Sequence, residues 1–137
     1  DLQVLPRISS NVSVFPTEPD ANPMGEWLAS LDKLRREVPD DVLVLPAHNE
    51  PFRGLHARLD YLAHSQHQAL ERLRRALGQP KRAVDIFGEL FGRPIGSEPT
   101  LLGMATGEGV AHLNYLLQRN EAVMEVDADG VAWYHVP

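Results

Sequence analysis

His48 is the residue whose type and position point most directly to chemistry. It lies in the loop 47–54, beside Asn49 and Glu50 and shortly after the apolar run Val42–Leu45. Loops at the carboxyl end of a buried strand often hold ligand-binding groups, and an imidazole there can bind a metal ion or move a proton. No HxH pair, HExxH motif or glycine-rich phosphate loop accompanies it, so an ordinary surface histidine is the competing interpretation.

A second group of metal-binding residue types is spaced along one predicted helix. His56, Asp60, His64, His67 and Glu71 follow one another at intervals of four, four, three and four residues, which places them on one helix face. Histidine and aspartate one turn apart can share a divalent metal. A solvated polar face opposite a leucine stripe explains the same pattern without a ligand, and we favour that interpretation.

Other kinds of catalysis find little support in the sequence. The 137 residues contain no cysteine, which excludes disulfides, thiolate metal sites and cysteine nucleophiles. No serine lies in a GxSxG nucleophile elbow. The formal charge of −6, from 13 basic and 19 acidic residues, disfavours non-specific binding to nucleic acid.

Neither a membrane span nor a signal peptide is expected. No apolar run approaches the roughly 18–20 residues of a membrane helix, and the N-terminus lacks the basic and apolar regions of a signal peptide. A cysteine-free chain of this kind is most simply cytoplasmic. Because the sequence starts at Asp1 rather than at Met, we expect it to begin part-way through a longer protein.

Two helices and a strand are expected to position His48. The spacing of apolar residues predicts an amphipathic helix over 24–37, with Asn22 as its N-cap. The run Val42–Leu45 predicts a buried strand, and a leucine stripe predicts a long helix over 55–77. This order of helix, strand, polar loop and helix is typical of α/β proteins.

A glycine–proline break at residues 78–80 predicts a boundary between a domain over 1–79 and a smaller one over 80–137. The elements expected after the break are a short helix over 83–91, a helix over 101–119 and a β-hairpin over 122–136 with an Asp-Gly turn. Two helices followed by a hairpin outline a small winged-helix-like module. Its scarcity of basic residues favours packing against another domain or subunit over binding to DNA.

Several blocks of the sequence resemble, in order, the C-terminal half of metallo-beta-lactamase-fold hydrolases. The blocks are Val4–Val14, Glu18–Pro23, Trp27–Leu31 and Leu43–Pro51, and the last resembles the final metal-ligand motif of the family. Residues 80–137 resemble the winged-helix-like domain that follows the hydrolase domain in the beta-lactamase-like branch. The resemblance covers essentially the whole chain. It implies an α/β (α+β) fold: the C-terminal half of an αββα sandwich followed by a small winged-helix-like α+β module.

The resemblance also implies a two-metal site, usually with zinc, and iron or manganese are alternatives that histidine and carboxylate ligands also suit. His48 matches the final histidine ligand of the family. The bridging aspartate of the family normally stands four residues before the proline of the Leu-Pro pair. Leu2 occupies that position here, and Asp1, one residue further away, is the candidate ligand. The HxHxDH motif and the next histidine ligand precede this region in the family and do not occur in this chain.

We therefore expect the C-terminal portion of a metal-dependent hydrolase, in which metal-activated water attacks an ester, thioester, lactone or phosphodiester in a small-molecule substrate. The 137 residues alone should not be catalytic, because one or two ligands cannot hold a dinuclear site. An apolar sheet face left exposed should be covered in a homodimer or by a missing N-terminal half. The alternative is a non-catalytic winged-helix-type interaction module that binds protein or nucleic acid without a metal.

Overall fold

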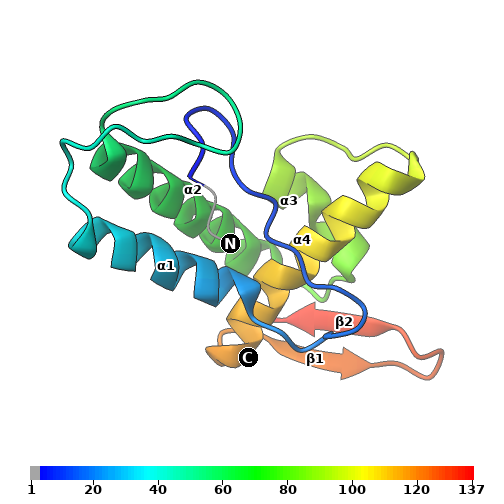
Figure 1. Cartoon of the computed structure of the whole chain (residues 1–137). Helices are drawn as coiled ribbons and strands as arrows, with labels where there is room; N and C mark the ends of the chain where they lie inside the picture. The colour runs from blue at the N-terminus through cyan, green and yellow to red at the C-terminus, as the bar shows by residue number, and fades with distance from the viewer. Residues whose placement is uncertain (1–3) are drawn as a thin grey trace.

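The computed structural model describes residues 4–137 and is mostly helical (Figure 1). Its elements are α1 (Pro23–Glu37), α2 (Leu55–Ala76), the 3₁₀ helix η1 (Ala83–Ile86), α3 (Phe87–Phe91), α4 (Pro99–Gln118), β1 (Val123–Val126) and β2 (Ala132–His135). Helices α1 and α2 lie side by side, and α3, α4 and the hairpin gather beyond them in Figure 1. The helices predicted over 24–37, 55–77 and 101–119 are confirmed to within two residues at each end.

Helix α1 begins where the sequence supplies a cap. The Asn22 side chain accepts a hydrogen bond from the Gly25 N–H at 3.0 Å, and Pro23 fills the first helical position, where no backbone donor is needed. One face of α1 is buried in a hydrophobic cluster that also includes residues of α2. The predicted cap is therefore confirmed, and it fixes the point at which the N-terminal segment turns into the helix.

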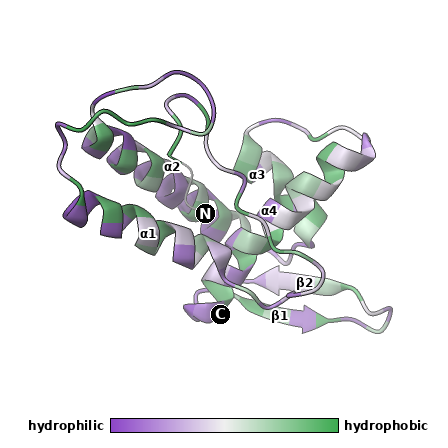
Figure 2. Cartoon of the chain, viewed as in Figure 1, coloured by the Kyte–Doolittle hydropathy of each residue, from purple (hydrophilic) through white to green (hydrophobic). Residues whose placement is uncertain are grey.

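Helix α2 supplies leucines to two hydrophobic clusters that residues 4–137 form. Its first half packs with α1 and the N-terminal segment, through Leu55, Leu59 and Leu62. Its second half packs with α3, α4 and the hairpin, through Leu70 and Leu73. Figure 2 shows apolar and polar residues alternating along α1 and α2, as expected for helices with one buried face. Among residues 4–137, no helix is long and apolar enough to cross a membrane.

The predicted hairpin is present, with strands β1 and β2 antiparallel and Met124 opposite Tyr134. The Asp127 side chain accepts two backbone N–H groups across the turn, each at 2.9 Å. Gly130 takes a positive φ of 80° there, a conformation that glycine adopts without steric cost. On the other edge of β2, Lys81 exchanges two backbone hydrogen bonds with Tyr134, which ties the hairpin to the segment after α2.

The prediction of a buried strand over Val42–Leu45 is wrong for this chain. Within residues 4–137, this run makes a single β-bridge, from Val44 to Phe52, and the side chains of Leu43 and Leu45 are 53% and 75% exposed. An apolar run forms a buried strand only where neighbouring strands and a second layer exist to receive it. The described residues supply neither.

The described part of the chain is therefore a small, mostly helical fold with one two-stranded hairpin, and it is not an αββα sandwich. The sandwich half expected over 1–79 is represented by α1, α2 and the long loop between them. The predicted division of the chain into 1–79 and 80–137 stays a prediction.

Candidate functional site

His48 lies in the middle of a loop that is closed at its base. The backbones of Val44 and Phe52 exchange two hydrogen bonds, at 2.9 and 3.1 Å. Asn49, next to His48, has a positive φ of 70°, which asparagine tolerates better than most residues. The His48 side chain is exposed and makes no hydrogen bond with the part of the chain that the structure describes. This imidazole is therefore available to a ligand from outside residues 4–137.

One ion pair fastens the His48 loop to the N-terminal segment. Arg7 donates to the Glu50 carboxylate at 2.6 Å, across 43 residues of sequence. In Figure 1 the long loop between α1 and α2 lies beside the dark-blue N-terminal segment, near one end of α2. Both side chains are exposed, so the pair serves to align the two segments and adds little to stability.

Arg58 of α2 binds the same N-terminal segment through its guanidinium group. Its guanidinium donates to the backbone carbonyls of Leu5 at 2.6 Å and of Ile8 at 2.9 Å, and it lies 5.2 Å from the centre of the Tyr61 ring. The contacts with Leu5 and Ile8 thus place this segment at the end of α2 that follows the His48 loop. Asp1 itself lies outside the described residues, so its assignment as a ligand stays a prediction.

The described residues do not form a metal site by themselves. Among residues 4–137, no three histidine, aspartate or glutamate side chains gather closely enough to hold a metal ion. Zinc sites use three or four protein ligands, and His48 can supply one imidazole nitrogen. Any metal bound through His48 therefore needs further ligands from residues outside this range.

The polar face of α2 joins this helix to α1. Arg35 donates to Nδ1 of His56 at 2.7 Å and to Asp60 at 3.0 Å. Because Nδ1 accepts, the other ring nitrogen of His56 carries the proton, and it donates to the backbone carbonyl of Val38 at 2.7 Å. The other members of the predicted face, His64, His67 and Glu71, are exposed. The structure thus supports the solvated polar face over the metal-binding interpretation.

A shallow apolar hollow of about 420 Å³ lies under the loop before His48. The side chains around it belong to the N-terminal segment, to α1, to the start of α2 and to the run Val42–Leu45. Figure 2 shows apolar stretches along this long loop, away from the packed helices. The hollow and the exposed Leu43 and Leu45 together form an apolar surface beside the candidate ligand.

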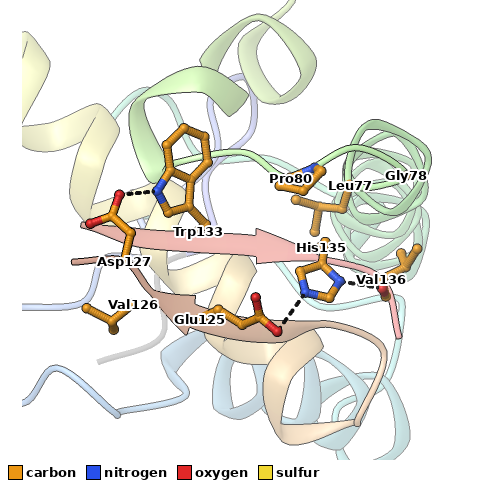
Figure 3. Close-up of a pocket in the computed structure, with 9 residues that line it drawn as sticks. All are labelled: Leu77, Gly78, Pro80, Glu125, Val126, Asp127, Trp133, His135 and Val136. Atoms are coloured by element: carbon orange, nitrogen blue, oxygen red, sulfur yellow. Dashed lines mark hydrogen bonds and ion pairs between the residues drawn. The ribbon is translucent and has the colours of Figure 1, made fainter. Parts of the chain in front are cut away.

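A second pocket, of about 340 Å³, lies between the hairpin and the end of α2 (Figure 3). Its polar groups pair with one another. The Trp133 indole donates to Asp127 at 2.8 Å, and His135 lies 3.7 Å from the Glu125 carboxylate. Both contacts join residues of the hairpin to one another. These side chains therefore have a structural role in the hairpin, and they do not indicate a ligand site.

Two buried titratable residues of α4 were not anticipated from the sequence. His112 is 2% exposed, and burial lowers the pKa of its imidazole. Glu108, one turn earlier, is partly buried, and the loss of solvent raises the pKa of its carboxyl group to about 6. Their spacing of four residues on an otherwise apolar helix is the signal that was available in the sequence.

Comparisons with known proteins agree with the resemblance noted in the sequence. A family model described as the C-terminal domain of metallo-beta-lactamase-like proteins matches residues 70–137. A beta-lactamase domain protein from Burkholderia ambifaria superposes with a TM-score of 0.92 and 41% identity, over 98% of this chain and 39% of that one. A metallo-beta-lactamase family protein from Thermus thermophilus superposes with a TM-score of 0.79 and 25% identity, over 98% and 40%. No curated protein matches the chain.

The fold and these matches define the class as the C-terminal part of metallo-beta-lactamase-like proteins. This chain belongs to the metallo-beta-lactamase family, as its resemblance predicted. It spans about 40% of the length of the solved relatives that it matches.

Proposed function

We propose that the chain is the C-terminal part of a metal-dependent hydrolase, in which His48 is one metal ligand. The observation that carries the proposal is the exposed imidazole, without a partner among residues 4–137, on a closed loop in a chain of this family. A bound zinc ion, or iron or manganese in its place, would activate water toward an ester, thioester, lactone or phosphodiester. The remaining ligands come from outside residues 4–137, and Asp1 is one candidate.

The apolar surface beside His48 supports a second part of the proposal, that the remaining half of an αββα sandwich covers it. Leu43 and Leu45 are more than half exposed, and burying a leucine fully stabilises a protein by roughly 1.5–3 kcal/mol. In that setting Val42–Leu45 gains the neighbouring strands that it lacks here and becomes the strand that its composition predicts. A homodimer that covers the same leucines is the alternative outcome.

Metal content tests the role of His48. The protein is purified with the residues that precede Asp1 in its gene, and bound metals are counted by elemental mass spectrometry. His48→Ala is expected to lose at least one metal ion per chain and to lose hydrolysis of activated esters. His64→Ala, which removes an exposed imidazole from α2, is the matched control and should keep both.

Two results would overturn this assignment. One is a His48→Ala protein that holds as much metal as the unaltered protein. The other is robust hydrolysis by residues 1–137 alone, because His48 and Asp1 are too few ligands for a dinuclear centre.

A further inference from the structure

We propose that the pocket between the N-terminal segment and the α3–α4 connection binds a medium-length acyl chain, with the carboxyl head group beside Arg93. The inference deepens the proposed function, on which its assignment as a substrate site rests. It names the ligand class as carboxylic acids with such acyl chains, which are the acyl products of ester or thioester hydrolysis.

Three separate parts of the chain build this pocket, which has a volume of about 230 Å³. Ser9, Ser10 and Asn11 form the side contributed by the N-terminal segment. The opposite sides come from the connection after α3 and from the first half of α4. The apolar side chains that line it are Phe91, Pro94, Ile95, Leu101, Met104 and Ala105.

Close packing beside the pocket holds the segments that form it. The N-terminal segment rests directly on α4, where the Val14 N–H donates to the Gly107 carbonyl at 3.0 Å. A Cβ atom at Gly107 would lie 3.1 Å from Cβ of Ser13, so glycine permits this close approach. On the other side, the Phe91 and Phe87 rings pack with their centres 6.0 Å apart. The pocket is thus a consequence of how the segment crosses α4.

The shape and lining of the pocket suit an acyl chain. The volume of about 230 Å³ leaves room for an alkyl chain of several carbons. Small-molecule sites are typically apolar with a few polar groups that orient the ligand. Here the apolar side chains provide the greater part of the lining and the polar groups lie at distinct positions among them.

Arg93 supplies the charge that a carboxyl group requires. Its guanidinium is exposed and makes no ion pair within residues 4–137, and a guanidinium can bind both oxygens of a carboxylate. Glu108 also lines the pocket, and burial raises the pKa of its carboxyl group to about 6. In its protonated form this carboxyl group can donate a hydrogen bond to a carbonyl oxygen of the ligand.

Calorimetric titration of sodium octanoate into the 137-residue chain at pH 6 tests binding without any metal. We expect one octanoate per chain. Met104→Trp places a larger side chain in the pocket at a position 49% exposed, and it should weaken binding at least tenfold. Met124→Trp, at a 47% exposed position on the hairpin, is the matched control and should leave the affinity unchanged. Arg93→Gln should weaken binding about tenfold.

Absence of saturable binding would overturn the proposal, as would equal affinities of the Met104→Trp and Met124→Trp proteins. Weakening by Leu45→Ser instead would place the octanoate on the apolar surface near His48 and would overturn it as well. Because this titration involves no metal, its result is independent of the His48 experiment. If octanoate binds and His48→Ala retains its metal, the proposal of an acyl-chain pocket stands and the proposal that His48 is a metal ligand of a hydrolase is rejected.

Discussion

His112 of α4 and Gln66 of α2 meet inside the molecule, with their side-chain polar atoms 2.9 Å apart. The exposed fractions of the two residues are 2% and 8%. Nδ1 of His112 donates to the Glu108 backbone carbonyl at 2.8 Å. Nε2 of the same ring faces Oε1 of Gln66, and burial lowers the pKa of the imidazole. This pair links the two longest helices of the fold.

Replacing Gln66 with leucine should destabilise the chain by about 1–3 kcal/mol, because it leaves Nε2 of His112 buried without a partner. Urea denaturation followed by circular dichroism measures the change. Gln68→Leu, at an exposed position on the same helix, is the control and should change the free energy of unfolding by no more than about 0.5 kcal/mol. Equal effects of the two substitutions would show that the buried hydrogen bond is unimportant.

The depressed pKa of His112 makes a specific contribution to the pH dependence of stability. The unfolded chain binds a proton at this imidazole more readily than the folded chain does, because burial opposes the charge. The contribution of neutral His112 to the stability of the folded chain is complete above 6.5, the ordinary pKa of histidine. It is lost as the pH falls below that value. Melting temperatures between pH 7.5 and 5 should therefore fall more steeply for the unaltered chain than for His112→Gln. Parallel curves for the two proteins would contradict this expectation.

Glu108 acts in the opposite direction, because its carboxyl pKa is raised from 4.5 to about 6. The folded chain binds the proton more tightly, so this contribution is complete below pH 4.5 and is lost as the pH rises through 6. At pH 8 the folded state bears the cost of a partly buried carboxylate. Glu108→Gln should then be more stable than the unaltered chain by about 1 kcal/mol, discounted for partial exposure, and the gain should vanish at pH 4.5. A gain that does not change with pH would refute the assignment.

Two glycines of α4 should respond oppositely to alanine. At Gly103 an added Cβ has no neighbour within 4 Å, so the better helix propensity of alanine should stabilise the chain by up to about 1 kcal/mol. At Gly107 the Cβ would lie 3.2 Å from the Val14 carbonyl oxygen and 3.1 Å from Ser13, and separating these segments should outweigh the gain. Thermal unfolding of the two variants checks the order. Stabilisation by Gly107→Ala would show that the N-terminal segment is not seated on α4.

Local patterns sufficed for the helices and the hairpin. The Asn22 cap, the leucine spacing of α2 and the Asp-Gly turn each act over a few residues, so their outcome depends little on distant contacts. The run Val42–Leu45 is different, because an apolar run becomes a strand only when a sheet is present to pair with it. Its composition predicts a strand that the described residues cannot complete.

The candidate site was only partly predictable, because its surroundings depend on contacts between residues that are far apart in the sequence. The type and loop position of His48 were sufficient to select it, and its exposure leaves it free to bind a ligand. The ion pair of Arg7 with Glu50 and the hydrogen bond of His112 with Gln66 each join residues more than 40 positions apart. No local spacing encodes such pairs, and Arg93 and Glu108 acquire a shared pocket only through tertiary packing.

The seating of the N-terminal segment on α4 has a consequence for the order in which the chain folds. Val14 bonds to Gly107, and Asn114 donates to the carbonyls of Pro19 and Ala21, so the N-terminal segment pairs with residues that are synthesised more than 90 positions later. At about 5–20 residues per second, a ribosome needs roughly 5–20 seconds to make the intervening stretch. During that interval the segment has no native partner on α4. Docking of the segment on α4 is therefore a late step, which follows the synthesis of that helix.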